Sequence, residues 1–458
     1  MTKKEFRELL EEKVLFLDGA TGSNLQKRGM PTGVCPELWI CEHPEVLQGL
    51  QQEYAQAGSD IVYAPTFGGN RIKMKEYGLE ERLEEINTKL VQISKQGVGE
   101  TILVAADLTM TGAQLEPLGD LKFETLIEVY KEQLAIIAKA GVDLIAVETM
   151  MSLQETRAAV IAAKEVCPEL PIIATLSFSE TGKTLYGADA AASVVVLQEL
   201  GVDAIGLNCS AGPDKMKAVY EKMHSVAKVP LIVKPNAGLP QMDAEGNTYY
   251  DMGPEDFKVC MKDIIVAGAR LVGGCCGTTP AYIQALKEAV EELKVQGQLP
   301  QPAESCVKDS SAECYLSSER EVFAFYNGQT LTLGASICLA DEDILEEYKN
   351  DEYDTATDLA FELLDKEVDA LVFNAVAEDV HEGQALVNLM EAVSSMVHLP
   401  VIAEVSSVEI AEYVLKKYSG VIGILPLFTA ESEMDKLFNA LKWYGAKMVT
   451  IDKQILCC

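Results

Sequence analysis

The segment FETLIEVYKEQLAIIAKAGVDLIAVETM, residues 123–150, contains the repeating unit of the first part of this chain. Its first half has the pattern of an amphipathic helix, and Gly141 stands where the C-cap of that helix is expected. The run DLIAVETM (143–150) then follows, mostly apolar and ending near the polar Glu148. The segment therefore predicts a helix followed by a buried strand of a parallel sheet.

The same unit recurs eight times within residues 1–290, which predicts an α/β fold with a (β/α)8 barrel. A doubly wound open sheet is the alternative architecture. We favour the closed barrel because the eight units are similar in size and polar residues end nearly every apolar run. These runs are VLFLDGA (14–20), DIVYAPTF (60–67), ILVAADLT (102–109), DLIAVETM (143–150), IIATLSF (172–178), AIGLNCS (204–210), LIVKPNAG (231–238) and LVGGCCG (271–277).

The carboxyl ends of the strands form the catalytic face of such a barrel. The residues at these ends are therefore the candidates for chemistry, selected by position alone. They are Asp18, Thr66, Asp107, Glu148, Ser177, Asn208, Cys209, Asn236, Cys275 and Cys276.

Three cysteines among these candidates predict a zinc site. Cys209 ends the sixth predicted strand, and the adjacent Cys275 and Cys276 end the eighth, with only one strand between them. Zinc prefers thiolate ligands, and a catalytic site keeps one position open for a substrate. Neighbouring residues of a strand point to opposite faces, so the pair can share a metal only if the glycines of GGCCG (273–277) allow a sharp turn. The alternative is that all three are small buried core residues.

Two carboxylates, Asp18 and Glu148, could bind the ammonium group of an amino acid, or could instead accept hydrogen bonds from loop amides. Gly19 and Gly22 in DGATGS could let backbone N–H groups approach a carboxylate.

Composition excludes several classes of function. The formal net charge of −33 argues against binding nucleic acid or an anionic membrane surface. No apolar run is long enough to span a membrane, and the first residues do not form a signal peptide. We expect a cytoplasmic protein, whose 12 cysteines serve a metal or the core and not a disulfide scaffold.

The sequence predicts a barrel over residues 1–298, a polar linker over 299–319 and a smaller α/β domain over 320–458. The last part repeats the strand–helix rhythm four or five times, about half a barrel. Because half a barrel cannot close, we expect it to form an open sheet, to form a homodimer or to dock a partner.

The motifs LDGATGSNLQKRG, AGSDIVYAPTFGGNRIKMKEYGL, GLNCSAGP, KPNAG and GGCCGTTPAYIQAL together resemble the homocysteine S-methyltransferase family, most closely the N-terminal module of cobalamin-dependent methionine synthases. The resemblance covers residues 10–290. It implies a zinc-dependent, methionine-forming enzyme whose metal ligands, and catalytic residues, are Cys209, Cys275 and Cys276. It also implies a homocysteine pocket formed by Asp18, Gly19, Thr66, Glu148 and Asn208, with the 19–22 loop. One departure is APTF, where Ala64 and Pro65 replace the usual Thr and Asn ahead of Thr66 and Phe67.

Residues 320–458 resemble the first half of a pterin-binding barrel, but the functional positions differ. The opening loop reads GASICLADE, the second strand keeps Asn374 without its usual Asp, and the third offers only Glu404. The expected methyl donor is therefore a methylcorrinoid (methylcobalamin) on a separate protein. S-methylmethionine, betaine, methylfolate and another thiol acceptor are alternatives, as is a scaffold or regulatory subunit that recruits a corrinoid protein.

Overall fold

The computed structural model describes residues 1–242, 248–301 and 313–457 of the chain. These residues form two compact units, the first from residues 1–190 and the described part of 202–308, and the second from residues 191–201 and the described part of 309–458. Within the described residues, no helix combines the length and the apolar character needed to cross a lipid bilayer.

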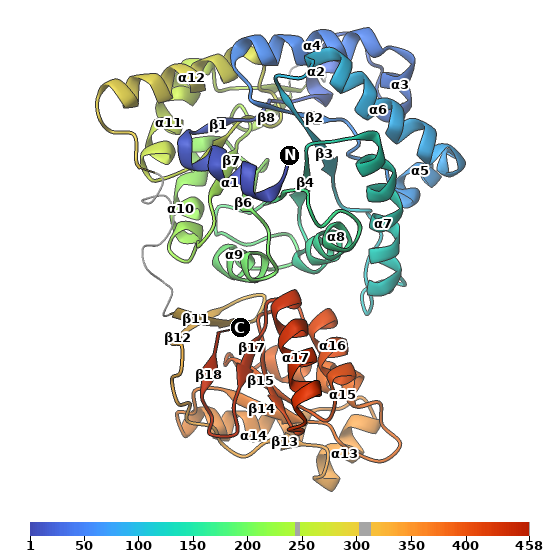
Figure 1. The fold of residues 1–458 in the computed structure, drawn as a ribbon, viewed down its shortest axis with the longest axis vertical. Helices are drawn as coiled ribbons and strands as arrows, with labels where there is room; N and C mark the ends of the chain where they lie inside the picture. The colour runs from blue at the N-terminus through green and yellow to red at the C-terminus, as the bar shows by residue number, and fades with distance from the viewer. Residues whose placement is uncertain (243–247, 302–312, 458) are drawn as a thin grey trace. The chain divides into compact units, whose positions relative to one another are not determined.

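The first unit contains a closed barrel of eight parallel strands, as the sequence predicts (Figure 1). Seven parallel pairings join the strands in the order β1-β10-β7-β6-β5-β4-β3-β2. A further parallel bridge between Leu17 and Ile61 joins the two ends, which excludes the doubly wound open sheet. The strands are β1 (Leu15–Phe16), β2 (Ile61–Ala64), β3 (Leu103–Leu108), β4 (Leu144–Met150), β5 (Ile172–Leu176), β6 (Ala204–Asn208), β7 (Leu231–Lys234) and β10 (Leu271–Val272).

Helices separate the barrel strands along the chain, and extra elements lie in the loops after β1, β2 and β7. The helices are α1 (Lys3–Glu12), α2 (Gly22–Lys27), α3 (Pro36–Glu42), α4 (Pro44–Ala57), α5 (Arg71–Glu76), η1 (Glu80–Arg82), α6 (Leu83–Val98), α7 (Phe123–Ala140), α8 (Leu153–Val166), α9 (Ala190–Glu199), α10 (Pro213–His224), α11 (Pro254–Val266) and α12 (Pro280–Val295), and the hairpin after β7 is β8 (Pro240–Met242) with β9 (Thr248–Tyr250).

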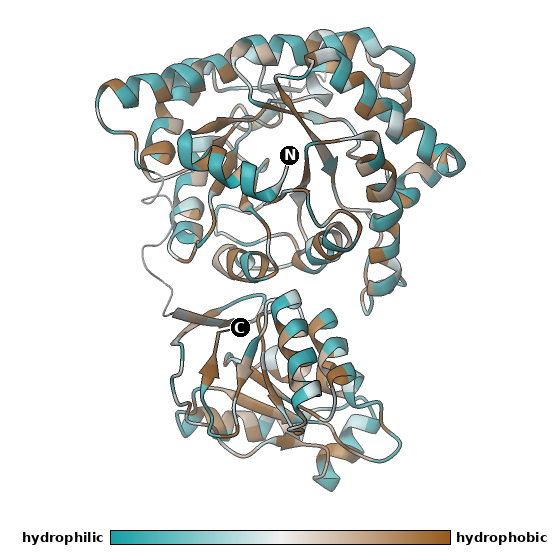
Figure 2. Ribbon diagram, in the orientation of Figure 1, coloured by the Kyte–Doolittle hydropathy of each residue, from teal (hydrophilic) through white to brown (hydrophobic). Residues whose placement is uncertain are grey.

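Helix α1 closes the amino-terminal end of the barrel, so the carboxyl ends of the strands are the open end. A capping box of Thr2 and Glu5 starts this helix. Its apolar residues Phe6 and Leu10 are fully buried against strand residues such as Leu15 and Tyr63. Figure 2 shows the apolar colour concentrated on the strands and the hydrophilic colour on the outward helix faces, as burial of the apolar face requires.

The second unit is a smaller α/β domain with an open sheet. Its strands are paired in chain order, parallel except for the last, and they pack with the helices into one apolar core. The six strands are β13 (Ile337–Cys338), β14 (Leu371–Asn374), β15 (Val401–Val405), β16 (Gly423–Pro426), β17 (Lys447–Val449) and β18 (Ile455–Leu456), and the helices are α13 (Glu342–Lys349), α14 (Asp354–Asp365), α15 (Glu382–Ser394), α16 (Val408–Lys417) and α17 (Glu431–Tyr444).

The predicted linker is only partly visible in the fold. Residues 302–312 lie outside the described residues, but Glu313–Ser317 form strand β11 and not irregular chain. This strand pairs antiparallel with β12 (Val322–Tyr326), and Cys314 and Leu316 are fully buried. The sequence did not predict this strand, because the residues around it are polar. Its pairing partner, β12, also lies outside the predicted linker.

Candidate metal centre

Three cysteine thiols converge at the carboxyl end of the barrel. The Sγ atoms of Cys209, Cys275 and Cys276 all lie within 4.8 Å of one another. Cys209 follows β6 directly, and both it and Ser210 adopt positive φ angles of 59° and 61°. Such backbone is uncommon outside glycine and is typical of functional sites.

A turn after β10 brings the two adjacent cysteines to the same side. The N–H of Cys275 donates to Pro235 O at 2.7 Å, and the N–H of Thr278 donates back to Cys275 O at 3.1 Å. Gly277 lies within this turn at φ +82°. The turn therefore supplies the change of direction that the sequence requires of GGCCG.

Asn208, at the end of β6, supports this group from behind. Its Nδ2 lies 3.8 Å from Cys275 Sγ and donates to Thr149 Oγ1 at 2.7 Å, while its Oδ1 accepts from the Thr149 N–H at 3.1 Å. Asn208 is fully buried, so its amide is fixed by these contacts. Ser177 Oγ donates to the carbonyl of Asn208 at 3.0 Å and holds the same strand end.

The donor set fits zinc. Zn–S bonds of about 2.3 Å in a tetrahedron place sulfurs roughly 3.8 Å apart, which is compatible with the observed spacing. Hydrogen bonds from Cys275 and Cys276 lower the pKa of Cys209 well below its usual value, which favours the thiolate form that a metal ion binds. Asn236 Oδ1 is buried without a partner among the described residues, and Tyr250 hydrogen-bonds to Cys276. Both lie beside the thiols.

A buried lysine occupies the floor of the site. Lys234, the last residue of β7, is 2% exposed and donates from Nζ to Glu148 Oε2 at 2.7 Å. The same Nζ lies 3.8 Å from Asp18 Oδ1 and 3.6 Å from the centre of the Tyr63 ring. Lys234 thus connects the two carboxylates that the sequence singles out.

Burial and charge compete at the carboxylates. Desolvation raises the pKa of Asp18 to about 7, although Lys234 and a 2.8 Å hydrogen bond from the Tyr63 N–H both favour its ionised form. Desolvation, and then the charge of Glu148, also raise the pKa of Asp107 well above its usual value. Three acidic groups close together cannot all ionise without a cation.

One cavity joins these groups. It has a volume of about 300 Å³, and its wall includes Asp18, Gly19, Glu148, Lys234 and the three cysteines. Two predicted substrate residues, Thr66 and Asn208, are fully buried and lie outside this wall. Thr66 Oγ1 instead bridges the backbone of Asp107, donating to its carbonyl at 2.9 Å and accepting from its N–H at 3.0 Å.

Part of the segment APTF (64–67), in which this chain differs from the usual family motif, lines the cavity. Pro65 and Phe67 line it, whereas Ala64 is fully buried within β2. Gly19 is held close to its surroundings, because a Cβ there would lie 2.6 Å from Thr278 Oγ1, while Gly22 has open space around it. Only the first of these two glycines is therefore required by close approach.

Sequence reasoning missed four residues of the site: Lys234, Tyr63, Thr149 and Tyr250. The available signal was Lys234, a charged residue inside the otherwise apolar strand LIVK, since a lysine is almost never fully buried without a partner. The other three carry no local signal, because only the fold brings them to the thiols.

In the second unit, Asn374 and Glu404 are the polar residues that the sequence keeps at the positions of the pterin-binding pattern. They lie together at the ends of β14 and β15. Glu404 Oε2 accepts from Asn374 Nδ2 at 2.8 Å and from Ser336 Oγ at 3.2 Å. The pterin-binding resemblance of this unit stays a prediction.

A (β/α)8 barrel with buried carboxylates at its open end, and with three thiols there that are close enough to hold a metal ion, has the layout of a barrel enzyme. The family model of homocysteine S-methyltransferases matches residues 15–290, more than half of the chain. The chain belongs to the homocysteine S-methyltransferase family.

Individual relatives agree with this assignment. Methionine synthase of Mycobacterium tuberculosis is 31% identical over 307 residues, which cover 63% of this chain and 25% of the relative. Methionine synthase of Mycobacterium leprae is 30% identical over 308 residues, covering 62% and 25%. The chain thus spans about a quarter of the length of these curated relatives.

Solved structures show the same fold. The homocysteine methyltransferase MmuM from Escherichia coli matches in its oxidised form with a TM-score of 0.52 at 23% identity, covering 62% of this chain and 98% of that one. Its metallated form matches with a TM-score of 0.51 at 24% identity.

Proposed function

We propose that the barrel transfers a methyl group to the thiol of homocysteine, forming methionine, with zinc held by Cys209, Cys275 and Cys276. The observation that carries this proposal is the convergence of three thiols within 4.8 Å in a barrel of this family. Three protein ligands leave one tetrahedral position for a substrate sulfur. When bound, zinc supplies the charge that holds a substrate thiol as the nucleophilic thiolate at neutral pH.

The residues of the cavity would bind the amino-acid end of the substrate. Asp18 and Glu148 face the cavity and would accept hydrogen bonds from the ammonium group. Lys234 favours the ionised form of Asp18, which the ammonium group requires. The backbone around Gly19 lines the same cavity and would orient the carboxylate. With both ends held, the sulfur is positioned for in-line attack on a methyl carbon.

The methyl donor is proposed to be a methylcorrinoid on a separate protein. A cavity of about 300 Å³ has room for homocysteine, but a corrinoid macrocycle is much larger and would have to approach from outside. A small onium compound, S-methylmethionine or betaine, would instead enter the cavity beside the substrate. Methylfolate is the third alternative, and it would need a pterin site elsewhere.

The test is methionine formation by the zinc-loaded chain from homocysteine with methylcobalamin, S-methylmethionine, betaine or methyltetrahydrofolate, each in a separate assay. We expect product with methylcobalamin, loss of product after chelation, and loss of both zinc and product in Cys209→Ala. Cys260→Ala, a half-buried cysteine on α11, is the matched control and should keep both. Product from a small onium donor alone would reassign the donor. No product with any donor, despite about one zinc per chain, would favour another thiol acceptor or a scaffold role.

A further inference from the structure

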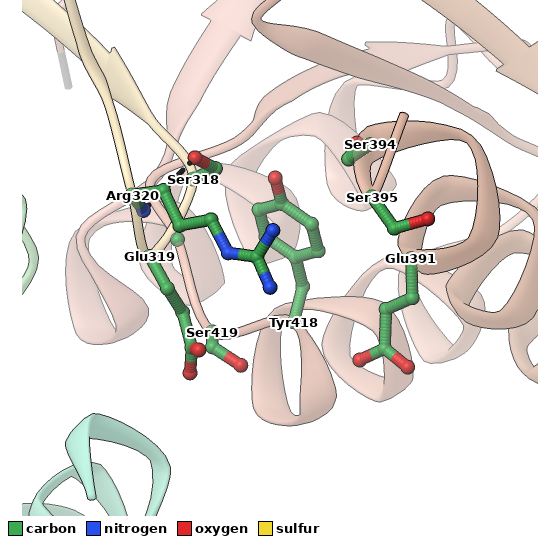
Figure 3. Close-up of a pocket in the computed structure, with 9 residues that line it drawn as sticks. Ser318, Glu319, Arg320, Glu391, Ser394, Ser395, Tyr418 and Ser419 are labelled. Atoms are coloured by element: carbon green, nitrogen blue, oxygen red, sulfur yellow. Dashed lines mark hydrogen bonds between the residues drawn. The ribbon is translucent and has the colours of Figure 1, made fainter. Parts of the chain in front are cut away.

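The second unit has a cavity of its own, with a volume of about 170 Å³ (Figure 3). It lies between the turn of the β11–β12 hairpin, helix α15 and the segment that joins α16 to β16. The side chains that matter for its chemistry are Glu319, Arg320, Glu391, Ser394 and Tyr418. None of them belongs to the barrel site.

Two opposite charges face this cavity without pairing. In Figure 3 the side chain of Arg320 extends from the hairpin turn toward Tyr418, and Glu391 lies on the other side of Tyr418, on α15. Within the described part of the chain, neither the guanidinium of Arg320 nor the carboxyl group of Glu391 makes a hydrogen bond or ion pair. Both residues are exposed, so each charged group is open to a ligand as well as to water.

A third polar group in the wall is also unsatisfied. Ser394 Oγ is buried and has no hydrogen-bond partner among the described residues. A buried hydroxyl without a partner costs on the order of 1–3 kcal/mol, and a ligand atom that hydrogen-bonds to it would remove that cost. The cavity thus presents a cation, an anion and a hydroxyl group together.

These groups define a ligand with two opposite charges. A guanidinium matches a carboxylate through two parallel hydrogen bonds, and a carboxylate matches an ammonium group. A ligand that carries only one of the two charges would leave the opposite charge of the wall unmatched. The volume is below the roughly 300 Å³ at which sites for drug-sized molecules begin, so the ligand is small.

We infer that this cavity binds a small zwitterionic α-amino acid, with its carboxylate on Arg320 and its ammonium group on Glu391. Tyr418, which is 5% exposed, provides an apolar wall for the rest of the ligand. An arriving ammonium group would stabilise the ionised carboxylate of Glu391. The site is independent of the barrel chemistry.

The test is isothermal titration calorimetry of the full zinc-loaded chain with each of the smaller standard α-amino acids and L-methionine. We expect saturable binding of at least one, weakened at least about tenfold in Arg320→Gln and in Glu391→Gln. Glu412→Gln is the matched control, because Glu412 is exposed on α16 without an ion pair among the described residues. Binding should be unchanged in this control and in Cys209→Ala, which alters the barrel site.

Analogues of the bound amino acid that lack one of its two charges test whether the cavity recognises both charges. The deaminated acid and the methyl ester should each bind at least about tenfold more weakly than the parent. The inference is overturned if no amino acid binds, if both cavity variants bind as tightly as the control, or if either analogue equals the parent. Thermal melting establishes whether the two cavity variants fold. If one of them does not fold, the binding measured for the other variant tests the inference.

Discussion

Replacing Lys234 by Met should destabilise the barrel strongly, because it leaves two buried carboxylates without their cation. The side chains of Lys234, Asp18 and Glu148 are 2%, 2% and 10% exposed. At 2.7 Å and 3.8 Å, with an effective dielectric constant of about 20, the two attractions amount to roughly 6 and 4 kcal/mol before desolvation. Loss of one partner of a buried ion pair costs about 3–5 kcal/mol net, and Met conserves the apolar stem.

The loss should depend on pH in a defined direction. The pKa of Asp18 in the folded chain is about 7, above its usual 3.8, and removal of Lys234 raises it further. A carboxyl group whose pKa is higher in the folded state destabilises the fold above its unfolded pKa and ceases to do so as the pH falls. The difference between the variant and the parent should therefore widen from pH 5 to pH 8.

Scanning calorimetry of both proteins, equally loaded with zinc, measures this difference. About 4 kcal/mol corresponds to a fall in the Tm of the barrel on the order of 10 °C at pH 8. Lys131→Met is the matched control: Lys131 pairs with Glu128 and Glu165 near the surface, and should cost at most about 1 kcal/mol. Equal effects of the two variants, or a gap that narrows as the pH rises, would refute the assigned role of Lys234.

Three further outcomes are expected. Gly274→Ala should lower the free energy of unfolding by about 1–3 kcal/mol and reduce zinc occupancy, measured by denaturation and metal analysis, because the new Cβ would lie 2.7 Å from Thr278 Cβ. Tyr250→Phe should keep the fold but release zinc at a pH about half a unit to one unit higher in an acid titration, because its hydrogen bond lowers the pKa of Cys276. An unchanged release midpoint would contradict that bond. Chelation of zinc should lower the barrel Tm, and restoring zinc should reverse it, since a ligand that binds only the folded state stabilises it.

The replacement at Pro65 has a structural consequence for substrate choice. Pro65 lines the cavity and has no backbone N–H, so this part of the wall offers one hydrogen-bond donor fewer than another residue would. Phe67, in the same wall, is 37% exposed. The side of the cavity around these two residues is therefore apolar, which suits a methyl group better than a charged one.

The sequence by itself determined the barrel and the three thiols. Alternation of apolar runs with amphipathic helices is a local pattern, and burial on both faces makes each parallel strand recognisable without its neighbours. The position of Cys209, Cys275 and Cys276 at strand ends follows from the same pattern. Strands β11 and β18 escaped it, because each belongs to an antiparallel hairpin and not to a strand–helix unit.

Only the tertiary structure decided how the site is charged. Lys234, Asp18 and Glu148 come from β7, from the segment after β1 and from β4, and no local spacing relates them. Their ion pairs depend on distances of a few ångströms across the barrel and on the exclusion of water, and both arise only when the strands close. Thr66 is a second example. Its sequence position places it at the carboxyl end of a strand, but only the folded barrel shows that its hydroxyl group bonds to the backbone of Asp107 and lies outside the cavity wall.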